Sequence, residues 1–229
     1  MIGILTVSHN RPKIDEAYCL MIDRLTRDYP NTFLPIATVS VEEEMETFKN
    51  HGIEVYQYKN NPVGEKHNFT INKFRDRVSH IIHLGSDDII DNNYINEILK
   101  HQGVNIAWGI GVYFYDTQNK VARFWDAPYR QVAGPAKIIS AELLDKCNWH
   151  IWDDTINSGL DHSCWKGMLP HIGSQATFRV KDINGLMVDL KSETNINLYR
   201  PFSTIGNQIE AEFIYNKISK PEADYLRSL

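Results

Sequence analysis

Short apolar runs alternate with amphipathic helical segments over residues 2–90, and this alternation restricts the possible folds more than any other feature of the sequence. The apolar runs cover residues 2–7, 34–39, 53–58 and 81–84, and each has the length and composition of a buried strand. The helical segments cover residues 13–29, 41–50 and 65–78. This order predicts an α/β fold, a parallel sheet in three α/β/α layers with right-handed crossovers.

The second half of the chain follows a mixed pattern. Residues 104–115 and 121–125 are apolar and aromatic and are separated by a polar turn, which predicts a hairpin. Short helices are predicted at 140–147 and 158–168, and an amphipathic helical tail from residue 207. Late strands are predicted at 177–181 and 186–190, around the turn Asn184-Gly185. With neither repeats nor a clear linker, residues 1–229 are predicted to form a single domain.

The composition argues against several classes of protein. Of the 229 residues, 42% are hydrophobic and 23% are charged, as is typical of a soluble globular protein. No apolar run approaches the ~20 residues of a membrane span, and the N-terminus lacks the features of a signal peptide, so a cytoplasmic protein is expected. The cysteines are three in number and widely spaced, which predicts neither a disulfide framework nor a zinc cluster. A net charge of −5 gives no overall attraction to nucleic acid.

Two adjacent carboxylates follow the fourth apolar run, in the sequence Gly85-Ser-Asp-Asp88. In open α/β sheets the ligand crevice lies outside the carboxyl ends of the strands. Neighbouring acids repel each other there, and a cation between them and a polyanionic substrate explains the pair. The alternative is a helix cap, which Ser86, Asp87 or Asp91 could provide, but one acid is enough for a cap. We therefore favour a cation site.

Three motifs together resemble those of GT-A fold glycosyltransferases, most closely the family-2-like branch. They are Ile4-Leu-Thr-Val-Ser-His-Asn-Arg-Pro12, Gly85-Ser-Asp-Asp88 and Gly159-Leu-Asp-His-Ser-Cys-Trp165, and they occur in the family's order and rough spacing. The resemblance implies a nucleotide-sugar-binding half at residues 1–103 and an acceptor-binding half at residues 104–229. It also implies a UDP-sugar donor and a divalent cation, Mn²⁺ or Mg²⁺. The implied activity is sugar transfer to an acceptor hydroxyl, with inversion at the anomeric carbon.

The resemblance also implies site residues on the donor side. Asp88 matches the final acid of the metal-binding motif, and Ser86 stands where the family usually has the leading acid. The family's later histidine ligand is missing here, so Asp189 or Lys191 stands in its place, with His171 as a further alternative. The expected donor contacts are Thr6, Ser8, Asn10, Arg11, Lys66, Asn68, Asp87 and Lys191. Lys191 would neutralise the diphosphate as a point charge.

Asp161 matches the family's general base. It lies in an acidic, tryptophan-containing segment, and apolar surroundings raise the pKa of a carboxyl, which suits proton abstraction. The alternative for Asp161 is a favourable position in the first turn of a helix. Asp153 and Asp154, in the preceding loop, are rival candidates for the same role.

The acceptor side is expected to include Arg123, Trp125, Tyr129 and Arg130, because mixed cationic and aromatic side chains bind sugars or nucleic acid. The small size and the motif style resemble phage-type glycosyltransferases that modify hydroxymethylated DNA bases, which would place the protein in the host cytoplasm. A glycan or small molecule is the other acceptor class. The remaining alternatives are an ordinary exposed hairpin at these residues, a non-catalytic sugar-nucleotide or glycan binding protein, and a nucleotidyltransferase. The last should carry a glycine-rich signature after the first strand, which Ser8-His-Asn-Arg-Pro12 lacks.

Overall fold

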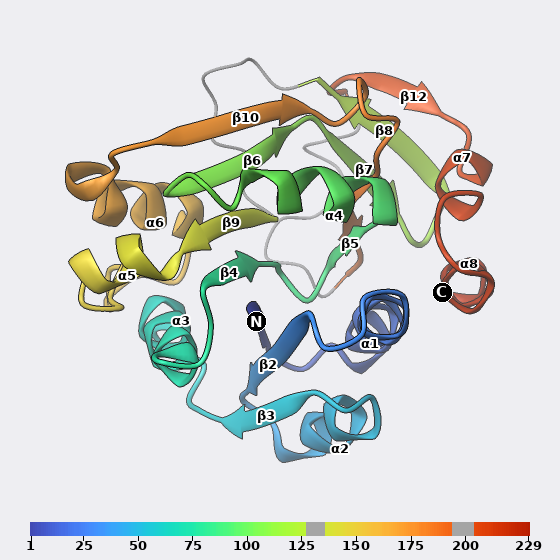
Figure 1. Cartoon of the computed structure of the whole chain (residues 1–229). Coiled ribbons are helices and arrows are strands. Elements are labelled where there is room, and N and C mark those ends of the chain that lie inside the picture. Colours follow the sequence, from blue (N-terminus) through green and yellow to red (C-terminus); the bar gives the residue numbers. More distant parts are fainter. Residues whose placement is uncertain (127–135, 194–203) are drawn as a thin grey trace.

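The computed structural model describes residues 1–126, 136–193 and 204–229, and Figure 1 shows their arrangement. Two sheets form the framework, one seven-stranded and one five-stranded, with helices packed around them. The described strands are β1 (Ile2–Ser8), β2 (Phe33–Val39), β3 (Glu54–Gln57), β4 (His80–His83), β5 (Asp88–Ile90), β6 (Ile106–Ile110), β7 (Val112–Asp116), β8 (Val121–Trp125), β9 (Lys137–Ser140), β10 (Gln175–Arg179), β11 (Met187–Lys191) and β12 (Asn207–Ile209). The described helices are α1 (Pro12–Asp28), α2 (Glu42–Asn50), α3 (Val63–Ile71), α4 (Asn92–Ile98), α5 (Ala141–Lys146), α6 (Leu160–Met168), α7 (Glu212–Tyr215) and α8 (Lys220–Ser228).

The seven-stranded sheet has the order β10-β6-β9-β4-β1-β2-β3. Strands β4, β1, β2 and β3 run parallel to one another, as the strand and helix alternation predicts. Strand β9 is antiparallel to both β4 and β6, which joins the two halves of the chain in one mixed sheet. The predicted α/β fold of the GT-A type, with a mixed C-terminal half, is confirmed.

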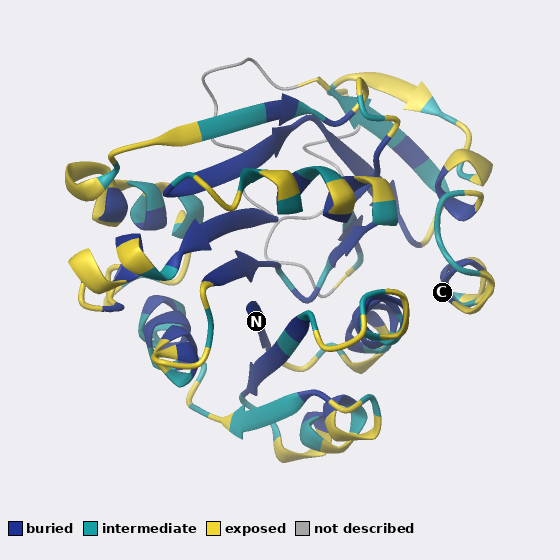
Figure 2. Ribbon diagram, in the orientation of Figure 1, coloured by how far each residue is buried: buried dark blue, intermediate teal, exposed yellow. Residues whose placement is uncertain are grey.

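Alternation along the central strands divides the core into two layers. Ile4 and Ile82 point to the face that packs against α1, whereas Leu5 and Ile81 point to the face that packs against α3, α5 and α6. Side chains two residues apart share a face of a sheet, so a continuously apolar strand is needed where helices cover both faces. Figure 2 shows the result, with buried central strands and more exposed outer strands β3, β10 and β12.

The five-stranded sheet has the order β12-β8-β7-β11-β5 and begins where Gly111 separates β6 from β7. Gly111 has φ +106°, and a Cβ at this position would lie 2.8 Å from Cζ of Phe124. Only glycine fits such a backbone beside a packed ring. The run at 104–115 is therefore two strands in different sheets, and its second part forms the predicted hairpin with β8.

Three further predictions of local structure differ from the fold. The strands around Asn184-Gly185 do not form a hairpin, because β10 pairs with β6 while β11 pairs with β7 and β5. Helix α3 ends at Ile71 and a 3-10 turn follows at Asn72–Phe74, so the helix is shorter than predicted. The tail begins with the short strand β12 before α7 and α8. Each difference reflects pairing or packing with a distant segment, which local periodicity does not report.

Candidate functional site

An acidic cluster lies where β5 and β11 pair. The antiparallel register places Asp88 directly opposite Asp189, and Asp87 immediately precedes β5. Burial, together with the charges of Asp87 and Asp189, raises the pKa of Asp88 well above its usual value. Burial and the charge of Asp87 raise the pKa of Asp189 to about 7. These raised pKa values mean that ionisation of the cluster is unfavourable without a counter-charge, so a bound cation would stabilise its ionised form.

Two cationic side chains border the acidic cluster. Nη1 of Arg11, from the loop after β1, lies 3.1 Å from Oδ2 of Asp87. Nζ of Lys191, at the end of β11, lies 2.6 Å from Oδ2 of Asp189, whereas Oδ1 of Asp189 is buried without a hydrogen-bond partner in the described residues. Asp88 accepts a hydrogen bond of 2.5 Å from the backbone N–H of Gly85. Cations and carboxylates thus alternate at this edge of the sheet, an arrangement that can bind a diphosphate and a divalent cation side by side.

Asp15 is a buried carboxylate beside this cluster that the sequence analysis did not single out. It lies in the first turn of α1 and accepts a hydrogen bond of 2.5 Å from the hydroxyl of Ser8 at the end of β1. Burial raises the pKa of Asp15 to about 7, although Ser8, Arg11 and Ser86 oppose the shift. Asp15 was missed in the sequence analysis because the buried face of α1 was identified from the helical spacing of apolar residues alone. Asp15 is a charged residue that is buried beside Ile14 in that helix.

Lys66 and Asn68 are buried, and the hydrogen bonds of their side chains connect neighbouring loops. The ammonium group of Lys66 donates to the backbone carbonyl of Ser8, the hydroxyl of Ser40 and Oδ1 of Asn60. Burial lowers the pKa of Lys66 to about 8. Asn68 donates to the backbone carbonyl of Trp152 at 2.7 Å and accepts from its N–H at 3.2 Å. Both side chains position the loops around the site, and their predicted contacts with a donor stay predictions.

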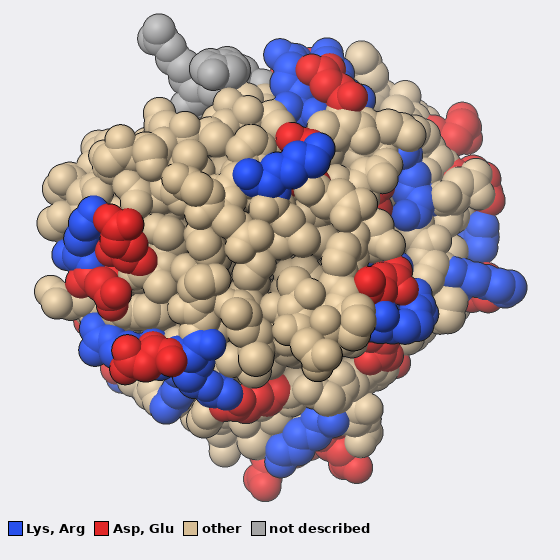
Figure 3. Space-filling view, in the orientation of Figure 1, with Lys and Arg blue, Asp and Glu red and all other residues tan. Residues whose placement is uncertain are grey.

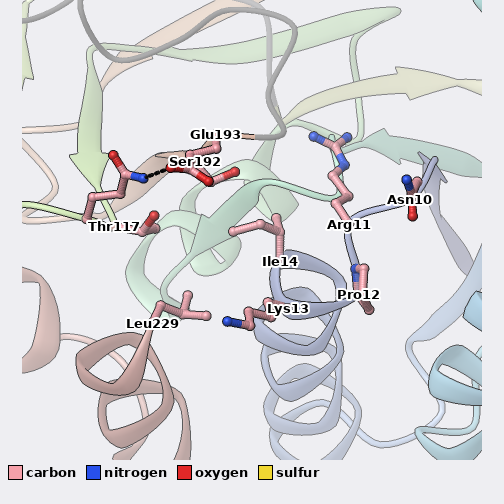
Figure 4. A pocket seen from close by; sticks show the side chains of 10 residues that line it. Asn10, Arg11, Pro12, Lys13, Ile14, Thr117, Ser192, Glu193 and Leu229 are labelled. Atoms are coloured by element: carbon pink, nitrogen blue, oxygen red, sulfur yellow. Dashed lines mark hydrogen bonds between the residues drawn. The ribbon is translucent and has the colours of Figure 1, made fainter.

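The loop after β1 also borders a cavity of about 410 Å³ (Figure 4). Thr6 and Ser8 are buried behind it, whereas Asn10 is exposed and has a left-handed backbone with φ 54°. The cavity is lined by Asn10, Arg11, Pro12, Lys13, Ile14, Thr117, Gln118, Ser192, Glu193 and Leu229. In Figure 4 the Arg11 side chain points away from Pro12 and the α1 helix.

Asp161, the predicted base, lies in the first turn of α6, after Gly159 with φ +67°. Its carboxylate is 50% exposed, and Oδ1 accepts a hydrogen bond of 2.9 Å from Nζ of Lys137 on β9. The rival acids have other contacts: Asp153 accepts from Thr155, and Asp154 accepts from Asn68. Of the three, Asp161 is therefore the acid that is both accessible and paired with a buried cation.

The Lys137 side chain lies among aromatic rings. His83 is its direct neighbour across the β4–β9 pair, and the rings of His67 and Trp152 lie 5.2 Å from that of His83. Burial and the charge of Lys137 lower the pKa of His83 to about 3, so this ring is neutral at physiological pH. Lys137 was not singled out in the sequence analysis, because a lone lysine at the start of a short apolar strand carries no local signal of burial.

The predicted acceptor residues are only partly within the described chain. The Arg123 guanidinium donates to the backbone carbonyls of Ile205 and Gly206, both at 3.0 Å. The ring of Trp125 stacks on Phe114 at a centroid distance of 6.3 Å. Tyr129 and Arg130 lie outside the described residues. Only Arg123 and Trp125 are therefore placed by the structure, and the role of all four residues stays a prediction.

Three further features concern metal binding, the membrane and the charge of the surface. Across residues 1–126, 136–193 and 204–229, no three His, Cys, Asp or Glu side chains are grouped so as to hold a metal on their own. Within the same residues, none of the helices has the length and apolar composition to cross a membrane. The face seen in Figure 3 carries Lys and Arg interspersed with Asp and Glu, with no continuous basic surface.

Neither a family model nor a curated protein matches the sequence. Solved structures do match the fold. TarS of S. aureus, residues 1–349, superposes with a TM-score of 0.52 at 12% identity, over 99% of this chain and 69% of that one. Glucosyl-3-phosphoglycerate synthase from Mycobacterium tuberculosis, solved with phosphoglyceric acid, gives 0.51 at 14% identity, over 78% and 70%. The inositol-1-phosphate CTP transferase of T. maritima gives 0.50 at 11% identity, over 85% and 91%. At these identities the likeness establishes the fold.

Proposed function

We propose that the protein is a glycosyltransferase that moves a sugar from a UDP-sugar to an acceptor hydroxyl, with inversion at the anomeric carbon. One observation carries the proposal. The β5–β11 pairing places Asp88 opposite Asp189, a few residues past the carboxyl end of β4 in the seven-stranded sheet, with Lys191 and Arg11 at the border. This is where open α/β sheets bind nucleotides. Similarity to a glucosyl-3-phosphoglycerate synthase adds support at the level of the fold.

The residues present fit a divalent cation. Mg²⁺ is commonly held by one or two carboxylates while substrate phosphates and water complete its shell, so a third protein ligand is not required. Asp88 and Asp189 would hold it, and the buried Oδ1 of Asp189 has no hydrogen-bond partner in the described chain. The cation would supply positive charge against the leaving diphosphate. Ser86 stands where the similar family usually has the leading acid, so the site carries less negative charge than it would with an acid there.

The protein's own residues would act in two places. Arg11 and Lys191 would bind the diphosphate. To do so, Arg11 would release Asp87 and Lys191 would release Asp189, the carboxylates that they contact in the structure. Asp161, half exposed at the start of α6, would accept the proton of the acceptor hydroxyl as that oxygen attacks the anomeric carbon. The acceptor class is a hydroxyl compound, and a hydroxymethylated pyrimidine of DNA remains one candidate beside glycans and small molecules.

A nucleotidyltransferase is the second candidate, and one observation favours it. The T. maritima inositol-1-phosphate CTP transferase superposes over 91% of its own chain, a larger share than the glucosyl synthase does. In such an enzyme a phosphate oxygen of a sugar phosphate would attack the α-phosphorus of a nucleoside triphosphate, forming a new P–O bond as pyrophosphate leaves. Against it stands the loop Ser8-His-Asn-Arg-Pro12, which lacks the glycines that would let backbone N–H groups surround a triphosphate.

The products distinguish the candidates. The protein is incubated with a panel of UDP-sugars and acceptors, or with nucleoside triphosphates and sugar phosphates, in Mn²⁺ or Mg²⁺, and the products are identified by mass spectrometry. A glycosyltransferase releases UDP and adds one sugar mass to an acceptor, or slowly hydrolyses the donor. Release of pyrophosphate would replace the proposal by nucleotidyl transfer. Donor binding without any turnover would instead indicate a non-catalytic binding protein.

A further inference from the structure

Lys137 is the one lysine on the seven-stranded sheet whose side chain is fully buried within the described residues, and its charged end lies at the candidate base. The side chain is 0% exposed, and its Nζ lies 2.9 Å from Oδ1 of Asp161. Lys137 is the cross-strand neighbour of His83 on β4. Asp161 itself is half exposed. The buried ammonium group of Lys137 therefore fixes one oxygen of the Asp161 carboxylate from the protein interior. The second oxygen of that carboxylate is left toward solvent.

We propose that Lys137 is a positioning residue that orients the carboxylate of Asp161 toward the acceptor hydroxyl, an assignment that rests on the proposed function. An unsupported aspartate in the first turn of a helix can adopt several rotamers. A hydrogen bond from a buried ammonium group selects one of them. Correct placement of a base within hydrogen-bonding distance is worth as much as its basicity, and a displacement of about 1 Å can cost about a hundredfold in rate.

The groups that face the Lys137 ammonium keep it charged. Burial alone would lower the pKa of Lys137, but the charge of Asp161 and its hydrogen bond to the ammonium group leave it raised. The rings of His83 and His67, from β4 and α3, are neutral because burial lowers the pKa of each. The ammonium group is therefore a fixed positive charge between the candidate base and the acidic cluster.

The test is a double-mutant cycle on turnover. Lys137→Met, Asp161→Asn and the double variant are compared with the parent for kcat and donor KM, using a donor–acceptor pair that the parent turns over. Lys137→Met should lower kcat about ten- to hundredfold with donor KM unchanged within about twofold. The double variant should be no slower than Asp161→Asn alone, because Lys137 acts only through that carboxylate. Lys137→Arg should recover part of the lost kcat.

Controls separate positioning from folding. Lys146→Met removes an exposed lysine paired with Glu142 at 2.6 Å on α5 and should leave kcat unchanged. Thermal unfolding of Lys137→Met checks that it folds. If it does not, Lys137→Gln takes its place in the cycle. Losses that multiply in the double variant, or a Lys137 variant with parental kcat, would overturn the assignment alone. A parent without sugar transfer would overturn the proposed function and this assignment with it.

Discussion

Asp88 on β5 and Asp189 on β11 are direct cross-strand neighbours, although they belong to opposite halves of the sequence. A strand of three residues, β5, is enough to form this pair, because it is inserted beside β11 at the edge of the five-stranded sheet. Like charges at facing positions destabilise a sheet unless something compensates them. Lys191 compensates one of the two carboxylates, which leaves the cluster available for a cationic ligand.

Divalent cations should therefore stabilise the protein together with UDP. UDP at a hundredfold excess over its Kd should stabilise the native state by about 2.7 kcal/mol, and Mn²⁺ or Mg²⁺ should increase the shift in melting temperature. Asp88→Asn should abolish the increment from the cation. Asp182→Asn, at an exposed turn, serves as the matched control and should keep it. An equal shift with and without cation in the parent would show that the cluster binds no metal.

Asp161→Asn should separate chemistry from binding. The substitution keeps the size of the side chain and removes the proton-accepting charge, so sugar transfer should fall about 10²- to 10⁴-fold while UDP binding stays unchanged. Asp88→Asn should instead weaken both. Steady-state kinetics and calorimetric titration with UDP measure the two effects. If Asp153→Asn or Asp154→Asn abolishes transfer while Asp161→Asn retains it, the base lies in the loop before α6.

The buried Arg24–Glu222 pair should be the strongest ionic contribution that ties the C-terminal helix to the fold. Nε of Arg24 on α1 lies 2.8 Å from Oε2 of Glu222 on α8, and Arg24 also donates to the backbone carbonyl of Ile90. Arg24→Met leaves the Glu222 carboxylate buried without this partner, and should lower the free energy of unfolding by about 3–5 kcal/mol. Urea unfolding measures the loss.

The exposed Lys220–Asp224 pair on α8 is the matched comparison for that experiment. Lys220→Met should leave the urea midpoint nearly unchanged, since solvent screens an exposed pair. Equal losses for Arg24→Met and Lys220→Met would mean that the buried pair is not what ties α8 to α1.

Buried neutral histidine should make the fold sensitive to acid. The pKa of His83 is about 3 in the native state against 6.5 for the free side chain, so between these values the unfolded state binds more protons. The contribution of His83 to the free energy of unfolding is therefore unchanged above pH 6.5 and is lost as the pH falls toward 3, by about 3 kcal/mol at pH 4.5.

His83→Phe removes this group while it keeps a ring beside His67 and Trp152. The variant should lose less stability than the parent between pH 7.5 and pH 4.5, as measured by urea unfolding at both values. His171→Phe is the control, because His171 is exposed. A parent and a His83→Phe variant with the same pH dependence would place the acid sensitivity elsewhere.

Local sequence patterns were sufficient for the framework. Continuous apolar runs and helical segments with period 3.6 located β1, β2, β4, α1 and α2, because each element buries its own side chains and so carries its own signal. Pro12 at the start of α1 and Asp91 as the cap of α4, which accepts the N–H of Tyr94 at 2.9 Å, follow the same local rules.

The tertiary structure alone decided how the site is assembled. The sequence placed Asp88 at the end of a strand, but the β5–β11 register is what makes Asp189 its neighbour. Asp15 is buried beside Ser8, and Lys137 is buried beside Asp161. Both burials depend on which helix covers which face of the sheet. Strand order and register are set by the summed packing of many side chains from distant segments, so no single stretch of sequence encodes them.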